Sequence, residues 1–157
     1  AEHIRKPTIS DILEIKGLID QAAESGAVLP RTAAELQENV RDFFVYVDED
    51  GVRGCCALHI DTEELAEIRS LVVTEDRQGR GIGVALVDAA IEEAGRLGMA
   101  RVYALTRIPR FFQKQGFEAI DKHDLPSKVY RDCVRCPLFP DCDEVAMIRI
   151  LDGSAPR

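Results

Sequence analysis

The sequence lacks any apolar run of about 18 residues, which is roughly what a helix needs to span a bilayer. Its first residues also lack the pattern of a secretory signal, so we expect a cytoplasmic protein that does not bind membranes. Positive charge is in deficit, because 20 Lys and Arg against 28 Asp and Glu give a formal net charge of −8. Nucleic acid is therefore not an expected partner, although a local group of arginines could still bind a small anion.

The cysteine pattern does not fit a disulfide framework, because the count is odd and no export signal is evident. The five cysteines are Cys55, Cys56, Cys133, Cys136 and Cys142. The adjacent pair Cys55-Cys56 falls in an expected strand, where small buried side chains explain it. A covalent nucleophile there would lack a nearby base.

The other three cysteines have the spacing of part of a zinc site, Cys133-x-x-Cys136 followed by Cys142. Structural zinc usually takes four ligands, and the fourth would have to be His123, Asp141, Asp143 or a distant cysteine. Three reduced thiols in a proline-rich loop explain the pattern equally well. We expect that no metal is required.

Apolar periodicity and turn residues divide the chain into elements of both kinds. We expect a single domain over residues 1–151 and a C-terminal tail over 152–157. The expected helices cover about 11–25, 32–42, 81–97 and 109–115. The expected strands cover 43–47, 52–61, 67–73, 101–106, a segment from 117 onward, and 145–151. This order predicts a mixed α/β (α+β) domain.

A glycine-rich turn joins the strand at 67–73 to the helix that follows it. Its sequence is Gln78-Gly79-Arg80-Gly81-Ile82-Gly83. Glycines let backbone N–H groups approach an anion, and the helix dipole favours negative charge there. The G-x-G-x-G spacing excludes the dinucleotide fingerprint, and the missing Gly-Lys-Ser/Thr ending excludes a Walker loop. Six residues alone remain compatible with a plain strand-to-helix turn.

The pattern Q-x-x-G-x-G, formed by Gln78, Gly81 and Gly83, resembles the pyrophosphate-binding turn of the GNAT N-acetyltransferases. The segment from Phe111 to Phe117 also resembles that family's aromatic-aromatic-x-x-x-Gly-Phe stretch. The resemblance covers residues 4–151. It implies a GNAT fold, with a mixed central sheet flanked by helices and acetyl-CoA bound as co-substrate at a splayed strand. The implied cofactor-binding residues are Leu71, Val72, Val73, Gln78, Gly79, Arg80, Gly81, Ile82, Gly83 and Phe112.

Further segments resemble the acetyltransferase domain of N-acetylglutamate synthases. They are Ser25–Thr32, Leu105–Arg107 and Asp124–Lys128. This resemblance implies transfer of acetyl to the α-amine of L-glutamate, the first step of arginine biosynthesis. The two carboxylates of a glutamate substrate would be bound best by guanidinium groups. Each candidate arginine could equally be an ordinary surface residue, and His59 could be a strand residue whose hydrogen bonds are satisfied within the protein. The candidate substrate-binding residues are Leu29, Arg31, His59, Arg69, Arg107 and Lys128.

One segment departs from the synthase pattern. Some larger synthases carry an arginine just before the last strand, whereas residues 140–144 here read Pro-Asp-Cys-Asp-Glu. The missing contact would then come from Lys128, Arg131 or Arg135, and glutamine or aspartate remains open as the acceptor. The alternatives are a GNAT enzyme for another amine, such as a polyamine or a protein N-terminus, and a non-catalytic acetyl-CoA sensor. The sequence is also compatible with a homodimer.

The chemistry needs the amine to lose a proton before it attacks the thioester, so a nearby base helps. Many GNAT enzymes place a glutamate where Glu67 stands, and strand alternation puts Glu67, Arg69 and Leu71 on one face. Simple pairing between Glu67 and Arg69 is the competing interpretation. The backbone N–H of Val72 or Val73 would stabilise the oxyanion. Phe112 stands where many relatives have an acidic tyrosine, so we expect direct attack without a strong side-chain acid.

Overall fold

The computed structural model describes residues 3–125 and 144–151, and the chain divides into two compact units. The first unit comprises residues 1–59 and 68–94, and the second comprises 60–67 and 95–157. The expected tail at 152–157 lies outside the described residues, and the expectation of a single domain stays a prediction. None of the helices in the described part has the length and apolar character of a membrane span.

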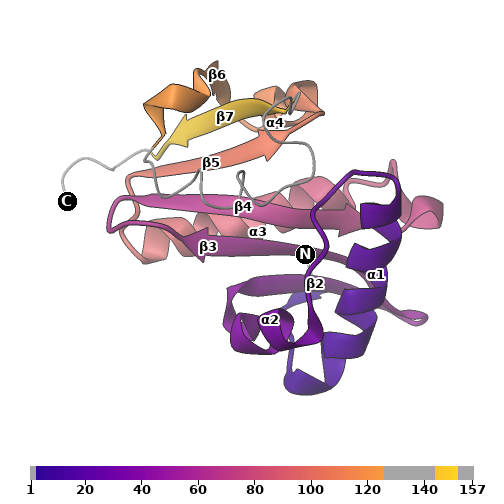
Figure 1. The fold of residues 1–157 in the computed structure, drawn as a ribbon. Coiled ribbons are helices and arrows are strands. Elements are labelled where there is room, and N and C mark those ends of the chain that lie inside the picture. The colour runs from indigo at the N-terminus through magenta and orange to yellow at the C-terminus, as the bar shows by residue number, and fades with distance from the viewer. Residues whose placement is uncertain (1–2, 126–143, 152–157) are drawn as a thin grey trace. The chain divides into compact units, whose positions relative to one another are not determined.

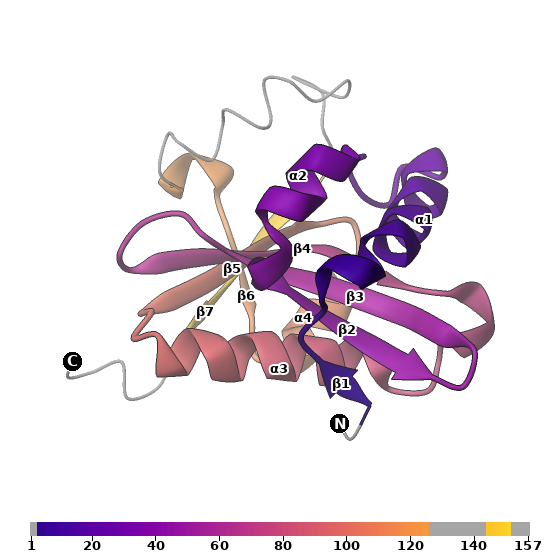
Figure 2. The same cartoon turned by 90° about the horizontal axis from the view of Figure 1, so that it is seen from below.

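The first unit is built on an antiparallel hairpin with helices on both faces (Figures 1 and 2). Figure 2 shows α1 and α2 on one side of β2 and β3, and α3 on the other. Its elements are β1 (Ile4–Arg5), η1 (Ile9–Asp11), α1 (Ile12–Glu24), α2 (Ala33–Glu38), η2 (Val40–Asp42), β2 (Phe43–Asp48), β3 (Gly51–Ile60), the later part of β4 (Leu65–Val73), η3 (Glu75–Arg77) and α3 (Ile82–Arg96).

The amphipathic helix predicted over about 11–25 is confirmed as α1. Its buried residues recur at helical spacing, as a core-facing stripe requires. They are Ile12, Ile15, Leu18 and Ile19. These side chains pack with residues of α2, β2 and β3 in one core, which includes Leu36, Phe43, Val45 and Cys55.

The second predicted helix is shorter than expected, because α2 ends at Glu38 and the 3-10 turn η2 follows. Asn39 leaves the helical conformation at φ −109° and ψ 19°. Its side-chain Nδ2 donates to the carbonyl of Glu35 at 2.8 Å. Asparagine competes with the helical backbone in this way, so the helix ends four residues earlier than the expected end at residue 42.

The other face of β3 lies against α3. A Cβ on Gly54 would lie 3.2 Å from Leu86 Cδ1 and 3.4 Å from Ile82 Cγ2. The absence of a side chain at this position therefore lets the start of α3 approach the sheet closely. The helix predicted over 81–97 is confirmed as α3, with its buried residues Ile82, Leu86, Val87, Ala90 and Ala94 at helical spacing.

The second unit pairs three strands of its own with the start of β4. Residues Leu65–Glu67 run parallel to the beginning of β5 (Arg101–Thr106), and β7 (Val145–Ile150) runs antiparallel to β5. The short strand β6 (Glu118–Ile120) pairs antiparallel with β7. The unit also contains α4 (Pro109–Lys114) and η4 (Lys122–Asp124). The hydrogen-bonded strand order is β1-β2-β3-β4-β5-β7-β6, which confirms the predicted mixed α/β class.

Candidate acetyl-CoA site and acceptor residues

The glycine-rich turn follows the 3-10 turn η3 and leads into α3. Gly79 and Gly81 have φ values of +80° and +83°, a conformation that residues with a Cβ rarely adopt. No atom lies within 4 Å of a Cβ built on either residue, so backbone conformation rather than space requires glycine at these two positions. Residues 78–81 are exposed, whereas Ile82 is buried and fixes the start of the helix.

Hydrogen bonds hold the two ends of this turn. The side-chain Nε2 of Gln78 donates to the carbonyl of Val73, the last residue of β4, at 3.0 Å. On the helix side, the N–H of Ala85 donates to the carbonyl of Gly81 at 3.0 Å. The first N–H groups of a helix have no partner within it, and here the exposed turn leads directly to them. The turn therefore has the backbone geometry of an anion site.

The middle of β4 carries an unusual backbone conformation. Ser70 has φ +57°, and it is the non-glycine residue with positive φ among the described residues. Ser70 is 7% exposed, and its carbonyl accepts from Cys55 Sγ at 3.4 Å. Glu67 and Arg69 are half-buried between buried neighbours, as the predicted alternation requires. After Ser70 the alternation ends, because Leu71, Val72 and Val73 are all half-buried.

Arg31 lies in the loop that leads into α2, where local contacts fix the backbone. Its carbonyl accepts from Lys16 Nζ of α1 at 3.2 Å. The next residue, Thr32, is the N-cap of α2 and forms a capping box with Glu35, with distances of 3.0 and 2.8 Å. The loop arginine and Leu29 are both half-buried. The capping box and Lys16 therefore fix the backbone position from which the side chain of Arg31 extends.

His59, near the end of β3, has a carboxylate partner. Its Nδ1 lies 3.1 Å from Asp42 Oδ2, and both side chains are 28% exposed. Because the carboxylate accepts, Nδ1 carries the proton in the neutral ring and Nε2 is the acceptor. This pairing favours an ordered histidine, which agrees with the interpretation of a satisfied strand residue as well as with a role in the acceptor pocket.

Glu67, Arg107 and Phe112 belong to the second unit. Glu67 pairs with Tyr103 in the parallel ladder, and the hydroxyl of Tyr103 donates to Asp61 Oδ2 at 2.5 Å. Arg107 is exposed directly after β5. Phe112 is 3% exposed, and its ring packs edge-to-face against Phe111 and Phe117, with centroids 5.1 and 5.2 Å away. Phe112 is therefore first of all a core residue of this unit.

Both cysteines of the described chain are free and buried. Burial raises the pKa of Cys56 to about 12, and it also raises the pKa of Cys55. Thiols that stay protonated are poor nucleophiles, which supports the packing role predicted for this pair. Lys128, Cys133, Cys136 and Cys142 lie outside the described residues. Within residues 3–125 and 144–151, no group of three or more His, Cys, Asp or Glu side chains is arranged to hold a metal ion.

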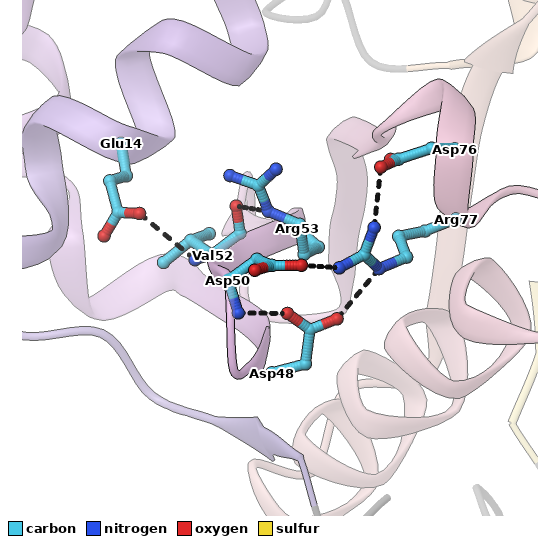
Figure 3. A network of polar contacts seen from close by, with 7 residues as sticks. All are labelled: Glu14, Asp48, Asp50, Val52, Arg53, Asp76 and Arg77. Atoms are coloured by element: carbon cyan, nitrogen blue, oxygen red, sulfur yellow. Dashed lines mark hydrogen bonds and ion pairs between the residues drawn. The ribbon is translucent and has the colours of Figure 1, made fainter.

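The structure adds a network of ion pairs that no sequence pattern predicts. Arg77 precedes the turn and contacts Asp48, Asp50 and Asp76 (Figure 3). An arginine beside a motif and acidic residues in a hairpin turn are ordinary surface features, and nothing in their spacing pairs them. The positive φ of Ser70 likewise has no counterpart in the sequence pattern.

The fold and the turn correspond to a known class of enzyme. Residues 39–119 match the family model described as acetyltransferase (GNAT) domain. The protein is therefore an acyltransferase. The chain belongs to the GNAT acetyltransferase family.

Three similar proteins place the chain within this family. An uncharacterised N-acetyltransferase of Chlorobaculum tepidum is 38% identical over 148 residues, which are 94% of this chain and 96% of that protein. An amino-acid acetyltransferase of Mycobacterium tuberculosis is 34% identical over 84% of this chain and 77% of that protein. The N-acetylglutamate synthase of Neisseria gonorrhoeae, solved with coenzyme A and N-acetyl-glutamate, superposes with a TM-score of 0.87 at 26% identity. That match covers 95% of this chain and 35% of the synthase.

Proposed function

We propose that this enzyme transfers the acetyl group of acetyl-CoA to the α-amine of L-glutamate. The observation that carries the proposal is the similarity to proteins named for this chemistry. The amino-acid acetyltransferase of M. tuberculosis is 34% identical over most of both chains. The matching structure from N. gonorrhoeae was solved with N-acetyl-glutamate.

The turn from Gln78 to Gly83 binds the pyrophosphate of acetyl-CoA in this proposal. Its support is the pair of left-handed glycines and the exposed approach to the first N–H groups of α3. Backbone N–H groups and the helix dipole together favour an anion at such a position. Arg80 is exposed within the turn and adds a positive charge toward the phosphates. Leu71, Val72 and Val73, with Phe112, are the remaining proposed contacts of the cofactor.

The acceptor is held by guanidinium groups, which pair with carboxylates through two parallel hydrogen bonds. Arg31, Arg69 and Arg107 are the proposed partners of the two glutamate carboxylates. Leu29, His59 and Lys128 complete the proposed set. The ordered start of α2 supports the role of Arg31, because its backbone position is set by the capping box.

In the proposed reaction Glu67 takes a proton from the ammonium group, directly or through water, and the free amine then attacks the thioester carbonyl. An amide C–N bond forms, the C–S bond of acetyl-CoA breaks, and the attacking nitrogen releases its second proton to solvent. The backbone N–H of Val72 or Val73 stabilises the developing oxyanion. Coenzyme A leaves as a thiolate, whose ordinary pKa makes a side-chain acid unnecessary.

The test is a thiol-release assay with acetyl-CoA and each of the twenty amino acids, with spermidine and a peptide with a free N-terminus as competing amines. Glutamate should give the highest kcat/KM. Preference for glutamine or aspartate would correct the acceptor, and preference for the polyamine or the peptide would replace the amino-acid assignment. Binding of acetyl-CoA with no release of thiol for any amine would refute the proposed reaction.

A further inference from the structure

Arg77 is the last residue of η3 and immediately precedes the glycine-rich turn. Three carboxylates surround its guanidinium group (Figure 3). Its Nε lies 2.9 Å from Asp48 Oδ2, its Nη2 lies 2.6 Å from Asp50 Oδ2, and its Nη1 lies 2.6 Å from Asp76 Oδ2. The side chains of Arg77 and Asp48 are only 13% and 10% exposed, whereas those of Asp50 and Asp76 are above 60%. The inner pair is therefore Arg77 with Asp48.

The hairpin turn between β2 and β3 holds its two carboxylates in place. Asp48 Oδ1 accepts from the N–H of Asp50 at 2.9 Å, and Gly51 closes the turn at φ +103°. Glu14 of α1 also holds the hairpin in place, because its Oε2 accepts from the N–H of Val52 at 3.2 Å (Figure 3). The acceptors for Arg77 are thus fixed by hairpin geometry and by α1, and not by Arg77 alone.

The charge of this network argues against direct phosphate binding by Arg77. One guanidinium and three carboxylates carry a net charge of −2, which would repel a diphosphate. All three guanidinium nitrogens are already engaged with carboxylates. The hydrogen bond from Arg77 also holds the pKa of Asp48 below its usual range, so that carboxylate stays charged and paired. Arg77 can therefore act on a bound anion only through the position of the backbone.

The neighbouring turn is held at its entry by the hydrogen bond from Gln78 Nε2 to the carbonyl of Val73, but the glycines between its two ends supply no side-chain contacts. Gly79 and Gly81 have no side chains and open space around them, and residues 78–81 are exposed. A mobile turn would have to be ordered when a ligand binds, at a cost in affinity. Arg77 joins the entry of the turn to a different element, the β2–β3 hairpin.

We propose that Arg77 is a positioning residue for acetyl-CoA: its ion pairs with Asp48 and Asp50 fix the entry of the Gln78–Gly83 turn on the β2–β3 hairpin, so that the N–H groups of the turn are aligned before the diphosphate arrives. This inference rests on the proposed role of the turn as the pyrophosphate site. It assigns a function to the hairpin, which lies outside the turn itself.

The experiment measures the Kd of coenzyme A by calorimetry, which needs no acceptor, together with the KM of acetyl-CoA, the KM of the acceptor and kcat. The variants are Arg77→Gln, Arg77→Lys, Asp48→Asn and the double variant Arg77→Gln/Asp48→Asn, with Gly81→Ala as the separate test of the turn itself. The matched control is Arg101→Gln, because Arg101 is a partly exposed arginine with a longer ion pair, 3.6 Å to Glu64 Oε1. Thermal unfolding of each variant verifies that it is folded at the assay temperature.

Arg77→Gln and Asp48→Asn should each raise the Kd of coenzyme A and the KM of acetyl-CoA about tenfold, since small misplacements of binding groups are costly. The KM of the acceptor should stay within about twofold, and the double variant should be no worse than either single one, as expected for two ends of one contact. Arg77→Lys keeps the charge but cannot form the fork, so it should also weaken binding. Arg101→Gln should bind as the wild type does.

Three results would overturn the inference while leaving the turn assignment intact. One is unchanged binding in Arg77→Gln while Gly81→Ala weakens it, and another is an equal rise in the KM of acetyl-CoA and the KM of the acceptor, which would indicate general loosening. Full binding by Arg77→Lys would mean that charge and not geometry matters, and it also contradicts the inference. If neither Arg77→Gln nor Gly81→Ala changes the Kd of coenzyme A, the proposed pyrophosphate site itself is wrong. If Arg77→Gln does not fold, Arg77→Lys and Asp48→Asn decide by the same criteria.

Discussion

Replacing Gly81 by alanine tests the backbone argument for the glycine-rich turn. Gly81 has φ +83°, and a residue with a Cβ pays about 1–2 kcal/mol in that conformation. No atom lies within 4 Å of the added Cβ, so no clash contributes. Alanine also restricts the unfolded chain, which offsets about 0.4–1 kcal/mol of that cost. The net expectation is a loss of about 1 kcal/mol, or a fall in Tm of about 2–4 °C for a chain of this size.

A matched substitution in the helix that follows the turn should have the opposite sign. Gly95 lies inside α3, is exposed, and has open space around a built Cβ. Glycine inside a helix is less favourable than alanine by about 0.5–1 kcal/mol, so Gly95→Ala should raise the Tm. Each variant adds one methyl group to the wild type. Comparing them separates the cost of a Cβ at positive φ from the general effect of replacing glycine by alanine.

The assay combines urea or thermal unfolding with the KM of acetyl-CoA. If Gly81→Ala displaces N–H groups from the diphosphate, lost hydrogen bonds to a charged group cost about 1.5–3 kcal/mol, which corresponds to a rise in KM of roughly 10- to 150-fold. Gly95→Ala should leave that KM unchanged. A Gly81→Ala protein as stable as the wild type would refute the conformational argument, and a destabilised one with an unchanged KM would refute the pyrophosphate role.

Three further outcomes follow from the structure. Arg5 donates two hydrogen bonds to Asp11, at 2.8 and 3.1 Å, and lowers the pKa of that carboxyl to about 2. Asp11→Asn should therefore lower the free energy of unfolding by about 1 kcal/mol near neutral pH. This value is reduced for solvent screening, because the side chain of Arg5 is 45% exposed. Because the folded pKa lies below the unfolded value of about 3.9, this loss should shrink in urea titrations as the pH falls towards 2, and a constant difference would contradict it. Glu67→Gln should remove the alkaline-rising limb of the pH–rate profile, and an unchanged profile would exclude Glu67 as the base. Arg31→Ala should raise the KM of glutamate about tenfold or more with little effect on that of acetyl-CoA, and equal effects on both would exclude its assigned role.

The fold was predictable wherever periodicity and local chemistry agreed. The stripe from Ile12 to Ile19 and the run of β-formers from Phe43 predicted α1 and β2 closely. Where one side chain competes with the pattern, the prediction failed, as at Asn39, whose amide bonds to the Glu35 carbonyl and ends α2. The two-residue strand β1 was also missed, because Ile4 and Arg5 show no pattern of their own and pair with β2 only in three dimensions.

The contrast between local sequence patterns and contacts that form only in three dimensions also explains why the acetyl donor is better predicted than the acceptor. The donor site is proposed to use main-chain groups, and glycines at positive φ leave a pattern in the sequence that can be read directly. The acceptor is proposed to be held by side chains such as Arg31 and Arg107, which lie at loop positions after elements end. The position of a guanidinium on a loop depends on helix caps and side-chain contacts, such as the capping box between Thr32 and Glu35. The sequence alone does not show which of these contacts form. A pattern of arginines therefore predicts an anionic acceptor more firmly than it predicts glutamate, and only turnover across the amino acids can separate the two.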